Sequence, residues 1–289
     1  ITELRRLRIM IIIIIIIIND HVYVVGREDS KAIETLGLNE LPLKWKKSHG
    51  EVPDDLVYYQ TVLYQQRVIR IGGYDGSSSS DVISELQLTP PVTVEKLCQM
   101  PKPRDSHGAE IFEDKILILG GENGDGGDDS GDDGYDYGDV YDYGYDDGDD
   151  ADEPLSSVLE YDLKKNECKE MPPLPRPLTS MATIRWRDQV VALGGLDKDD
   201  QVLNDVFMYG CKTGKTTALP SMLEKRCKCF AVITGNTIVV MGGENEKEDS
   251  LKSVECFTMG DYTWEYLPDM NNVRSWAVAQ VLPCRRKYV

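Results

Sequence analysis

Three arginines occupy matching positions in the chain, and their side chains could form a site for anionic groups. Arg104, Arg226 and Arg274 each follow a methionine by four residues. Guanidinium groups gathered on one rim bind carboxylates or phosphates through paired, charge-assisted hydrogen bonds. The same arginines could instead pair with acidic side chains inside the fold. The sequence leaves both interpretations open.

A glycine- and lysine-rich segment, GCKTGKTT at residues 210–217, has the residue types of a phosphate-binding loop. Such a loop has four residues between its glycines, so that backbone amides wrap the phosphates. Only three residues separate Gly210 from Gly214, and we expect a turn between two strands here, with no helix to follow. The sequence therefore predicts no nucleotide site.

The histidines and cysteines form no recognisable metal site. His21, His49 and His107 stand at unrelated places, and Cys227 and Cys229 make only a C-x-C pair. We therefore expect no metal and no cofactor. The seven cysteines are odd in number and scattered, which is typical of reduced thiols in a cytoplasmic protein.

One segment carries most of the net charge of −18. Residues 122–153 hold 15 of the 50 acidic residues and no basic residue, which leaves 35 acids against 32 bases elsewhere. The near-neutral remainder lacks the basic patch of a nucleic-acid-binding protein. With five tyrosines, eight glycines and no calcium-loop pattern, the segment is predicted to be a disordered surface loop. Weak cation binding and tyrosine phosphorylation stay open as roles.

The run Ile9–Ile18 consists of ten consecutive apolar residues behind three arginines. It has about half the length that a membrane helix needs, and no small-residue cleavage pattern follows it. We interpret Ile13–Ile18 as a β-strand, with Asn19 and Asp20 as the turn to the next strand. The sequence therefore predicts neither a membrane segment nor an export signal.

A repeat of about 48 residues organises the chain. Glycine pairs end four short apolar runs, at Gly72-Gly73, Gly120-Gly121, Gly194-Gly195 and Gly242-Gly243. The first glycines are 48, 74 and 48 residues apart. An aromatic residue stands fourteen positions after the second glycine at Tyr209 and Phe257, and at Tyr161 once the 26 extra residues are allowed for. The acidic segment is therefore an insertion into the third repeat.

Each repeat fits four short strands. Before each glycine pair, two apolar runs flank a polar pair, as in a β-hairpin, and an alternating strand, a turn and a last strand follow. Four strands per repeat at this period indicate a β-propeller, in which small antiparallel sheets pack around an axis. Glycine suits the end of the second strand because it permits positive φ and close backbone contact.

The pattern resembles the kelch repeat, in which an apolar strand ends in Gly-Gly and a Tyr and then a Trp follow. The best match is Val239–Ala277, with Gly242-Gly243, Phe257 in place of the Tyr, and Trp264. Other copies depart from the pattern. Val94, Cys168 and Thr216 stand in place of the Trp, and Gln87 stands in place of the Tyr.

The register extends towards both ends. Gly26-Arg27 takes the glycine-pair position of the first repeat and Trp45 its Trp position, while Arg274 begins a sixth copy. We expect one all-β domain, residues 1–289, a kelch-type β-propeller with five four-stranded repeats plus the first half of a sixth. This would be a six-bladed type, truncated at its C-terminus. The expected repeats are residues 9–55, 56–103, 104–177, 178–225, 226–273 and, in part, 274–289.

The resemblance implies a non-catalytic module that binds a partner protein or peptide. In kelch-like adaptors, the loops after Gly-Gly and the loops before each repeat's first strand open on one face and carry the partner-binding residues. The residues that match these positions are Arg104, Ser106, Arg226, Arg274, Ser275 and Trp276, with Tyr74, Asp75, Asn123, Asp197 and Asn245. The arginines would favour an acidic ligand.

The resemblance also implies a cellular role. Kelch propellers of BTB-kelch adaptors recognise substrates for cullin-based ubiquitin ligases, so substrate recognition in ubiquitination is the implied role here. Other kelch propellers bind actin, and some are oxidases or sugar epimerases. These are the alternatives. No nucleic-acid or membrane partner is expected.

Overall fold

The computed structural model describes residues 12–18, 21–27, 32–37, 45–88, 91–124 and 153–277. These ranges contain strands and no helix. Accordingly, they include no helix long and apolar enough to cross a membrane. Residues 125–152 of the acidic segment and residues 278–289 of the expected sixth repeat lie outside the described residues, so the predicted disordered loop and half repeat stay predictions.

Five four-stranded antiparallel sheets follow one another along the chain. Sheet 1 contains β1 (Ile12–Ile18), β2 (His21–Arg27), β3 (Ala32–Gly37) and β4 (Trp45–Glu51). Sheet 2 contains β5 (Gln60–Tyr64), β6 (Arg67–Ile71), β7 (Val82–Gln87) and β8 (Thr93–Gln99). Sheet 3 contains β9 (Gly108–Phe112), β10 (Lys115–Leu119), β13 (Val158–Asp162) and β14 (Glu167–Met171). Sheet 4 contains β15 (Ala182–Trp186), β16 (Gln189–Leu193), β17 (Val206–Gly210) and β18 (Thr216–Leu219), and sheet 5 contains β19 (Phe230–Thr234), β20 (Thr237–Met241), β21 (Val254–Thr258) and β22 (Glu265–Leu267).

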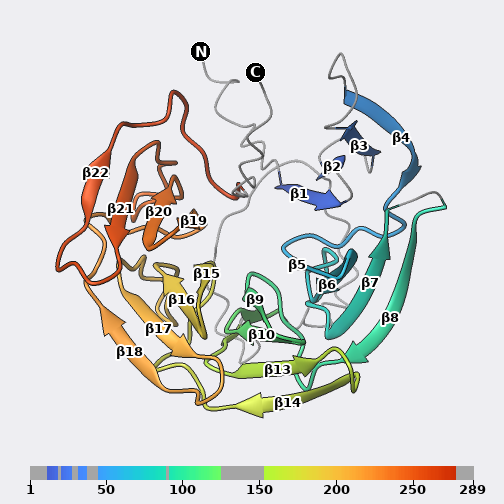
Figure 1. The fold of residues 1–289 in the computed structure, drawn as a ribbon, viewed down its shortest axis with the longest axis horizontal. Coiled ribbons are helices and arrows are strands. Elements are labelled where there is room, and N and C mark those ends of the chain that lie inside the picture. The colour runs from blue at the N-terminus through green and yellow to red at the C-terminus, as the bar shows by residue number, and fades with distance from the viewer. Residues whose placement is uncertain are drawn as a thin grey trace, which may run out of the picture.

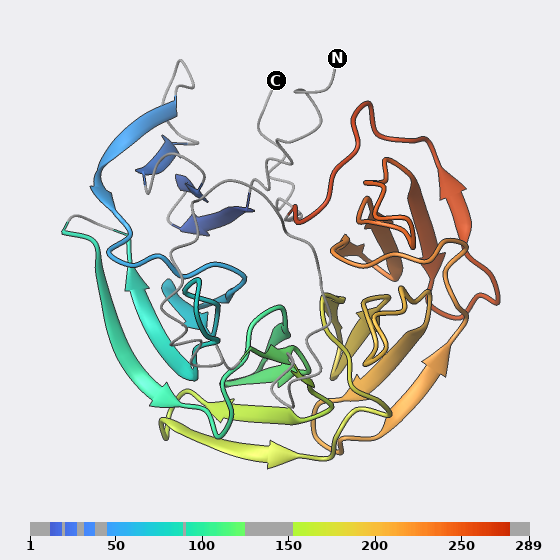
Figure 2. The same cartoon turned by 180° about the vertical axis from the view of Figure 1, so that it is seen from behind.

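The sheets stand around a common axis as in a propeller (Figure 1). In every sheet the strands are ordered as they occur in the chain, from an innermost first strand to an outermost fourth strand. The view from behind shows the same radial arrangement (Figure 2). Each sheet lies within one of the expected repeats, and the isoleucine run forms β1, paired with β2 from Ile12↔Arg27 to Ile18↔His21. The prediction of an all-β propeller with a strand at Ile13–Ile18 is confirmed.

The glycine pairs lie where one sheet meets the next. Gly242 has φ of +60°, and a Cβ on it would lie 2.2 Å from the carbonyl oxygen of Arg274. A side chain cannot fit there, so only glycine allows this approach. The following Gly243 donates its N–H to the same carbonyl at 2.8 Å. The pairs at residues 72, 120 and 194 make equivalent contacts, which confirms the role expected for them.

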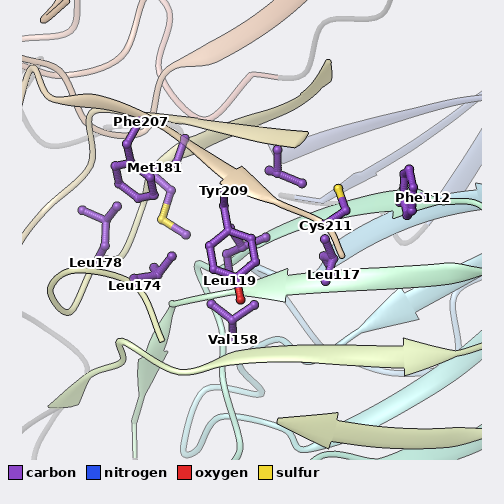
Figure 3. Packing of buried hydrophobic residues seen from close by; sticks show 12 residues of the cluster. Phe112, Leu117, Leu119, Val158, Leu174, Leu178, Met181, Phe207, Tyr209 and Cys211 are labelled. Carbon is purple, nitrogen blue, oxygen red and sulfur yellow. The ribbon is translucent and has the colours of Figure 1, made fainter. Parts of the chain in front are cut away.

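Apolar side chains fill the spaces between adjacent sheets. Tyr209 lies in the cluster between sheets 3 and 4, beside Leu119 and Val158 (Figure 3), and its hydroxyl donates to the Pro172 carbonyl at 2.6 Å. Phe257 and Trp264 stack with ring centroids 5.3 Å apart in the cluster between sheets 4 and 5. Tyr161, Tyr209, Phe257 and Trp264 are thus core residues, each removing a large apolar area from water.

Tight turns close the hairpins of the two inner strands. Gln65 and Gln66 connect β5 to β6, and Glu113 and Asp114 connect β9 to β10. Gln65, Gln66 and Glu113 have positive φ, as two-residue hairpin loops require. Arg187 and Gly235 open the equivalent turns of sheets 4 and 5, also with positive φ. In sheet 1, Asn19 and Asp20 lie outside the described residues, whereas Trp45 begins β4.

Candidate functional site

The two sets of loops expected to carry partner contacts lie on one face. One set precedes the innermost strand of each sheet, and the other follows each glycine pair. Isolated β-bridges join the sets at Val57–Tyr74, Asp105–Glu122, Thr179–Leu196 and Cys227–Glu244. The hairpin turns of the inner strands lie at the opposite ends of those strands. We call the side with the bridged loops the loop face.

Arg104 does not reach the surface of the loop face. Its side chain is fully buried, and Nη1 donates to the Gly120 carbonyl at 2.9 Å while Nη2 donates to the Ser157 hydroxyl at 3.0 Å. Burial lowers the pKa of Arg104 to about 10, so the guanidinium stays charged at neutral pH. The expectation that Arg104 binds a partner is therefore wrong: Nη1 and Nη2 donate to carbonyl and hydroxyl oxygens of its own sheet, and Nε is buried without a hydrogen-bond partner among the described residues.

Arg226 has the same internal role. Nη1 donates to the Gly242 carbonyl at 2.8 Å, and Nη2 forms ion pairs with Glu224 and with the fully buried Glu255. Glu255 also accepts the backbone N–H of Leu223 at 2.6 Å. The expectation of partner binding is corrected here as well. The alternative interpretation, pairing with local acids, describes Arg226.

Arg274 differs from the other two because its side chain is exposed. Its backbone carbonyl nevertheless accepts from the glycine pair of the preceding repeat, as do the carbonyls of Arg104, Leu178 and Arg226. This position therefore links its loop through the backbone to the glycine pair of sheet 5. Of the three arginines, only Arg274 presents its guanidinium to solvent on the loop face.

The expected polar residues after the glycine pairs stabilise their own loops. Oδ1 of Asp75 accepts from the N–H groups of Ser77 and Ser78, both at 2.8 Å, and these bonds lower the pKa of Asp75. Asp197 and Asn245 use Oδ1 in the same way, which is typical of Asx turns. The loop before the acidic segment is different: the equivalent Oδ1 of Asn123 is buried and has no hydrogen-bond partner among the described residues.

A chain of backbone hydrogen bonds runs around the axis on the loop face. Five residues form this axial belt, one from each inner loop that the structure describes: Tyr58, Ser106, Ser180, Lys228 and Trp276. Each has φ between +49° and +55°. From Ser106 onwards, the N–H of each donates to the carbonyl of the one before it, at 3.1, 2.9, 2.8 and 2.9 Å in chain order. Ser106 and Trp276 were expected at this face, whereas Tyr58, Ser180 and Lys228 were missed, although all stand fourteen residues before a first glycine.

Side chains of the axial belt gather where its two ends meet. The rings of Tyr58 and Trp276 are tilted against each other with centroids 4.8 Å apart. Nζ of Lys228 lies 5.3 Å from the centre of a Trp276 ring and 2.9 Å from Oε2 of Glu244. All three belt side chains are half-buried. We call this aromatic and cationic group the axial patch.

The neighbouring expected residues lie beside the axial patch or in the bridged loops. Ser275 precedes Trp276, and its hydroxyl lies 3.5 Å from that of Ser250. Tyr74 is half-buried and pairs through its backbone with Val57 and Ser79. Both residues are therefore held by contacts between loops of this face.

Ser79 anchors the point where the acidic segment leaves the described chain. Its hydroxyl donates to Oδ2 of Asp105 at 2.6 Å and accepts the N–H of Gly124 at 2.9 Å. Ser106 donates to the other oxygen of Asp105 at 2.7 Å. A short hairpin, β11 (Glu122–Asn123) with β12 (Glu153–Pro154), joins the two ends of the segment. Both ends are therefore fixed on the loop face.

Two titratable side chains near the axis have strongly shifted pKa values. His107 is fully buried, and burial, then the charge of Arg104, lowers its pKa to about 3, so the ring is neutral. Glu110 on β9 is half-buried and accepts from the Thr183 hydroxyl of the next sheet at 3.3 Å. Burial raises the pKa of Glu110 to about 7. Both groups lie in the packing between sheets rather than on an open surface.

The remaining motifs are the glycine- and lysine-rich segment at residues 210–217 and the His and Cys residues. Gly210 ends β17, and a turn through Thr213 and Gly214 returns the chain to β18, as expected from the sequence. Within the described ranges, no three His, Cys, Asp or Glu side chains gather as a metal site would require.

Residues 225–271 match the family model of the kelch motif. Over 113 residues, 39% of this chain, the sequence is 27% identical to "Kelch repeat and BTB domain-containing protein 2" of cowpox virus (strain Brighton Red). Over 125 residues it is 30% identical to "Kelch-like protein 41a" of Danio rerio. The matched part spans about a fifth of the length of these relatives. The chain thus contains a kelch-repeat domain that resembles those of BTB-kelch proteins.

A solved structure supports the fold over nearly the whole chain. The molecule described in "Structure of YjhT" superposes with a TM-score of 0.74 and 15% sequence identity, covering 93% of this chain and 86% of that one. At this identity the similarity concerns the fold alone. The fold is a kelch-type β-propeller, as the sequence predicts.

Proposed function

We propose that this chain is a non-catalytic module that binds a segment of a partner protein at the axial patch. The observation that carries the proposal is the convergence of Tyr58, Lys228 and Trp276, from three different repeats, beside the axis. Trp and Tyr are among the residue types that contribute most to the binding energy of protein interfaces. The kelch relatives support an interaction role for the propeller.

The partner segment that fits this patch is apolar or aromatic rather than strongly acidic. The expectation of an acidic ligand depended on three arginines, and two of them are enclosed. Lys228 is already paired with Glu244. Binding should therefore change less than about threefold between low and high salt, because few long-range charge interactions contribute.

Photo-crosslinking tests where the partner binds. A crosslinking amino acid is placed at Tyr58 in one protein and at Glu113, an exposed turn residue at the opposite end of the inner strands, in a matched control. We expect a specific partner to crosslink to position 58 and not to position 113. Equal crosslinking at both positions would contradict the proposal.

The crosslinked partner then allows the affinity to be measured. Trp276→Ala and Lys228→Ala should each weaken binding about tenfold or more, while Glu113→Ala leaves it unchanged. Circular dichroism of each variant shows whether the fold is retained. Stoichiometric bound copper or turnover of sugars by the purified chain would instead support an enzyme.

A finer proposal concerns the cellular role. The names of the relatives pair kelch repeats with a BTB domain, and this supports recognition of substrates for a cullin-based ubiquitin ligase in the cytoplasm. The test is co-purification of the full-length protein with a cullin, and ubiquitination of the crosslinked partner. Loss of ubiquitination in the Trp276→Ala variant is the expected result, and unchanged ubiquitination would contradict it.

A further inference from the structure

Two cysteine thiols meet at the outer rim, where sheets 2 and 3 adjoin. Sγ of Cys98 on β8 lies 3.8 Å from Sγ of Cys168 on β14, although 70 positions separate them in the sequence. β8 and β14 are the outermost strands of their sheets. Both cysteines are half-buried, so small reagents can reach them, whereas Cys211, Cys227 and Cys229 are buried. The pair lies away from the axial patch, so an inference about it is independent of the proposed function.

The backbone around the two thiols holds them in this position. Cys98 pairs with Ile83 and Lys96 with Ser84, so Leu97 is the extra residue of a β-bulge. The free carbonyl of Leu97 accepts from Nδ2 of Asn166 in sheet 3 at 2.8 Å. This bond joins the two sheets one residue before Cys98 and two residues before Cys168. The thiol contact is therefore part of a built junction.

Asn166 is itself fixed in its turn. Its Oδ1 accepts from the hydroxyl of Tyr161 at 2.8 Å, and its backbone has φ of +57°. Tyr161 lies in the core between sheets 2 and 3. The two strands therefore keep the sulfur atoms close in the reduced protein, and an approach of less than about 2 Å would bring them to the 2.05 Å of a disulfide bond.

We propose that Cys98 and Cys168 are a reversible dithiol site that closes to an inter-sheet disulfide on reaction with a disulfide oxidant, such as glutathione disulfide. The Cys98 thiolate attacks one sulfur of the oxidant and releases one glutathione thiolate, leaving a mixed disulfide. The Cys168 thiolate then attacks Sγ of Cys98 and releases the second glutathione. The protein loses two electrons and two protons, and the oxidant is reduced to two thiols.

The order of attack follows from the surroundings of Cys168. Burial raises the pKa of its thiol to about 12, so little thiolate is present at neutral pH. Cys168 is therefore better placed as the second, intramolecular nucleophile, since its sulfur already lies beside Cys98. We therefore expect the disulfide between Cys98 and Cys168 to form slowly, over a long incubation with the oxidant.

The test uses the wild-type chain in glutathione buffers of increasing oxidised fraction. After equilibration the samples are acid-quenched, alkylated and digested, and mass spectrometry locates the disulfides. We expect a crosslinked peptide that joins Cys98 to Cys168 within one chain, and its loss when excess reduced glutathione is added. Wild-type protein that carries only glutathione adducts or free thiols at these two residues would overturn the proposal.

Serine variants provide the matched controls. Cys98→Ser and Cys168→Ser should each abolish the crosslink and leave glutathione or a free thiol on the remaining cysteine. Cys256→Ser, which changes a half-buried cysteine in sheet 5, should leave the crosslink intact. A crosslink that forms in urea but not in the folded wild-type chain would show that the folded geometry does not favour it, and would overturn the proposal without any variant.

Discussion

The guanidinium of Arg226 is enclosed between the carboxylates of Glu224 and Glu255. Arg226 and Glu255 have no exposed side-chain surface, so each charge depends on the other for compensation. Arg226 thus ties the glycine turn of its own repeat, at Gly242, to Glu255 on β21 and to Glu224 at the end of the preceding repeat. The arginine side chain, which suggested ligand binding, stabilises the fold through internal ion pairs instead.

Replacing Arg226 with methionine should destabilise the protein by about 3–5 kcal/mol, because Glu255 would be left as an unpaired buried charge. Urea unfolding measures the change. The double variant Arg226→Met with Glu255→Gln should recover part of the loss, since glutamine still accepts from Leu223 without a charge. If Arg226 acted only at the surface, the single variant would lie within about 0.5 kcal/mol of wild type.

Glu110 should make stability depend on pH. Its folded pKa of about 7 is raised above the ordinary 4.5, so the folded state holds a proton that the unfolded state has released. Stability therefore falls as pH rises from about 4.5 to 7, and stays lower above pH 7. Glu110→Gln should raise stability by about 1–3 kcal/mol at pH 8 and by almost nothing at pH 4. Thermal unfolding at both pH values measures this, and an equal effect at both would contradict it.

The sheet junctions depend on the absence of a side chain at the first glycine of each pair. Gly242 and Gly235 make a matched comparison because their φ values are +60° and +61°. A Cβ on Gly242 would lie 2.2 Å from a backbone oxygen, whereas a Cβ on Gly235 has no atom within 4 Å. An alanine at either position would have the same unfavourable φ. The two positions differ in the room available for its Cβ.

Gly235→Ala should therefore cost about 1 kcal/mol, the ordinary penalty of a left-handed alanine. Gly242→Ala should cost at least about 3 kcal/mol, since the junction with Arg274 must open as well. Chemical unfolding of both variants gives the difference. Equal losses of unfolding free energy in the two variants would show that the close approach at Gly242 does not contribute to stability.

The sequence predicted the positions of the repeat that only one kind of residue can occupy. Gly72, Gly120, Gly194 and Gly242 could be recognised because nothing else fits, and Tyr209 and Phe257 because a buried ring has few substitutes. Only Ser106 and Trp276 of the axial belt were expected from the sequence, because the five members share a backbone conformation but no common residue type. The sequence left enclosure of the arginines open but did not predict the acceptors of Arg104, which are the Gly120 carbonyl and the Ser157 hydroxyl rather than acidic side chains.

At the scale of the whole molecule, the acidic segment begins and ends at fixed points of sheet 3. The β11–β12 pairing and the bond from Gly124 to Ser79 hold its two ends. Arg104 and Arg226 are enclosed, so they offer this acidic segment no exposed basic partner on the loop face. Its effect on stability can be tested separately from its function.

Replacing residues 125–152 with a Gly-Ser-Gly-Ser linker should stabilise the propeller by about 1–2 kcal/mol, because a shorter loop loses less entropy on closure. Urea unfolding monitored by tryptophan fluorescence measures the change. As a control, a flexible linker of the original length should leave stability unchanged. A loss of stability with both linkers would show that the native segment contributes specific contacts.

The axial belt has a consequence for how such a protein can diversify. Its hydrogen bonds involve main-chain groups alone. The side chains at the five positions can therefore change while the backbone fold stays the same. The residue types that these positions accept are limited. Proline lacks the N–H, and β-branched residues such as valine and isoleucine disfavour positive φ. A combinatorial library over residues 58, 106, 180, 228 and 276 should thus yield new specificities far more often than misfolded chains.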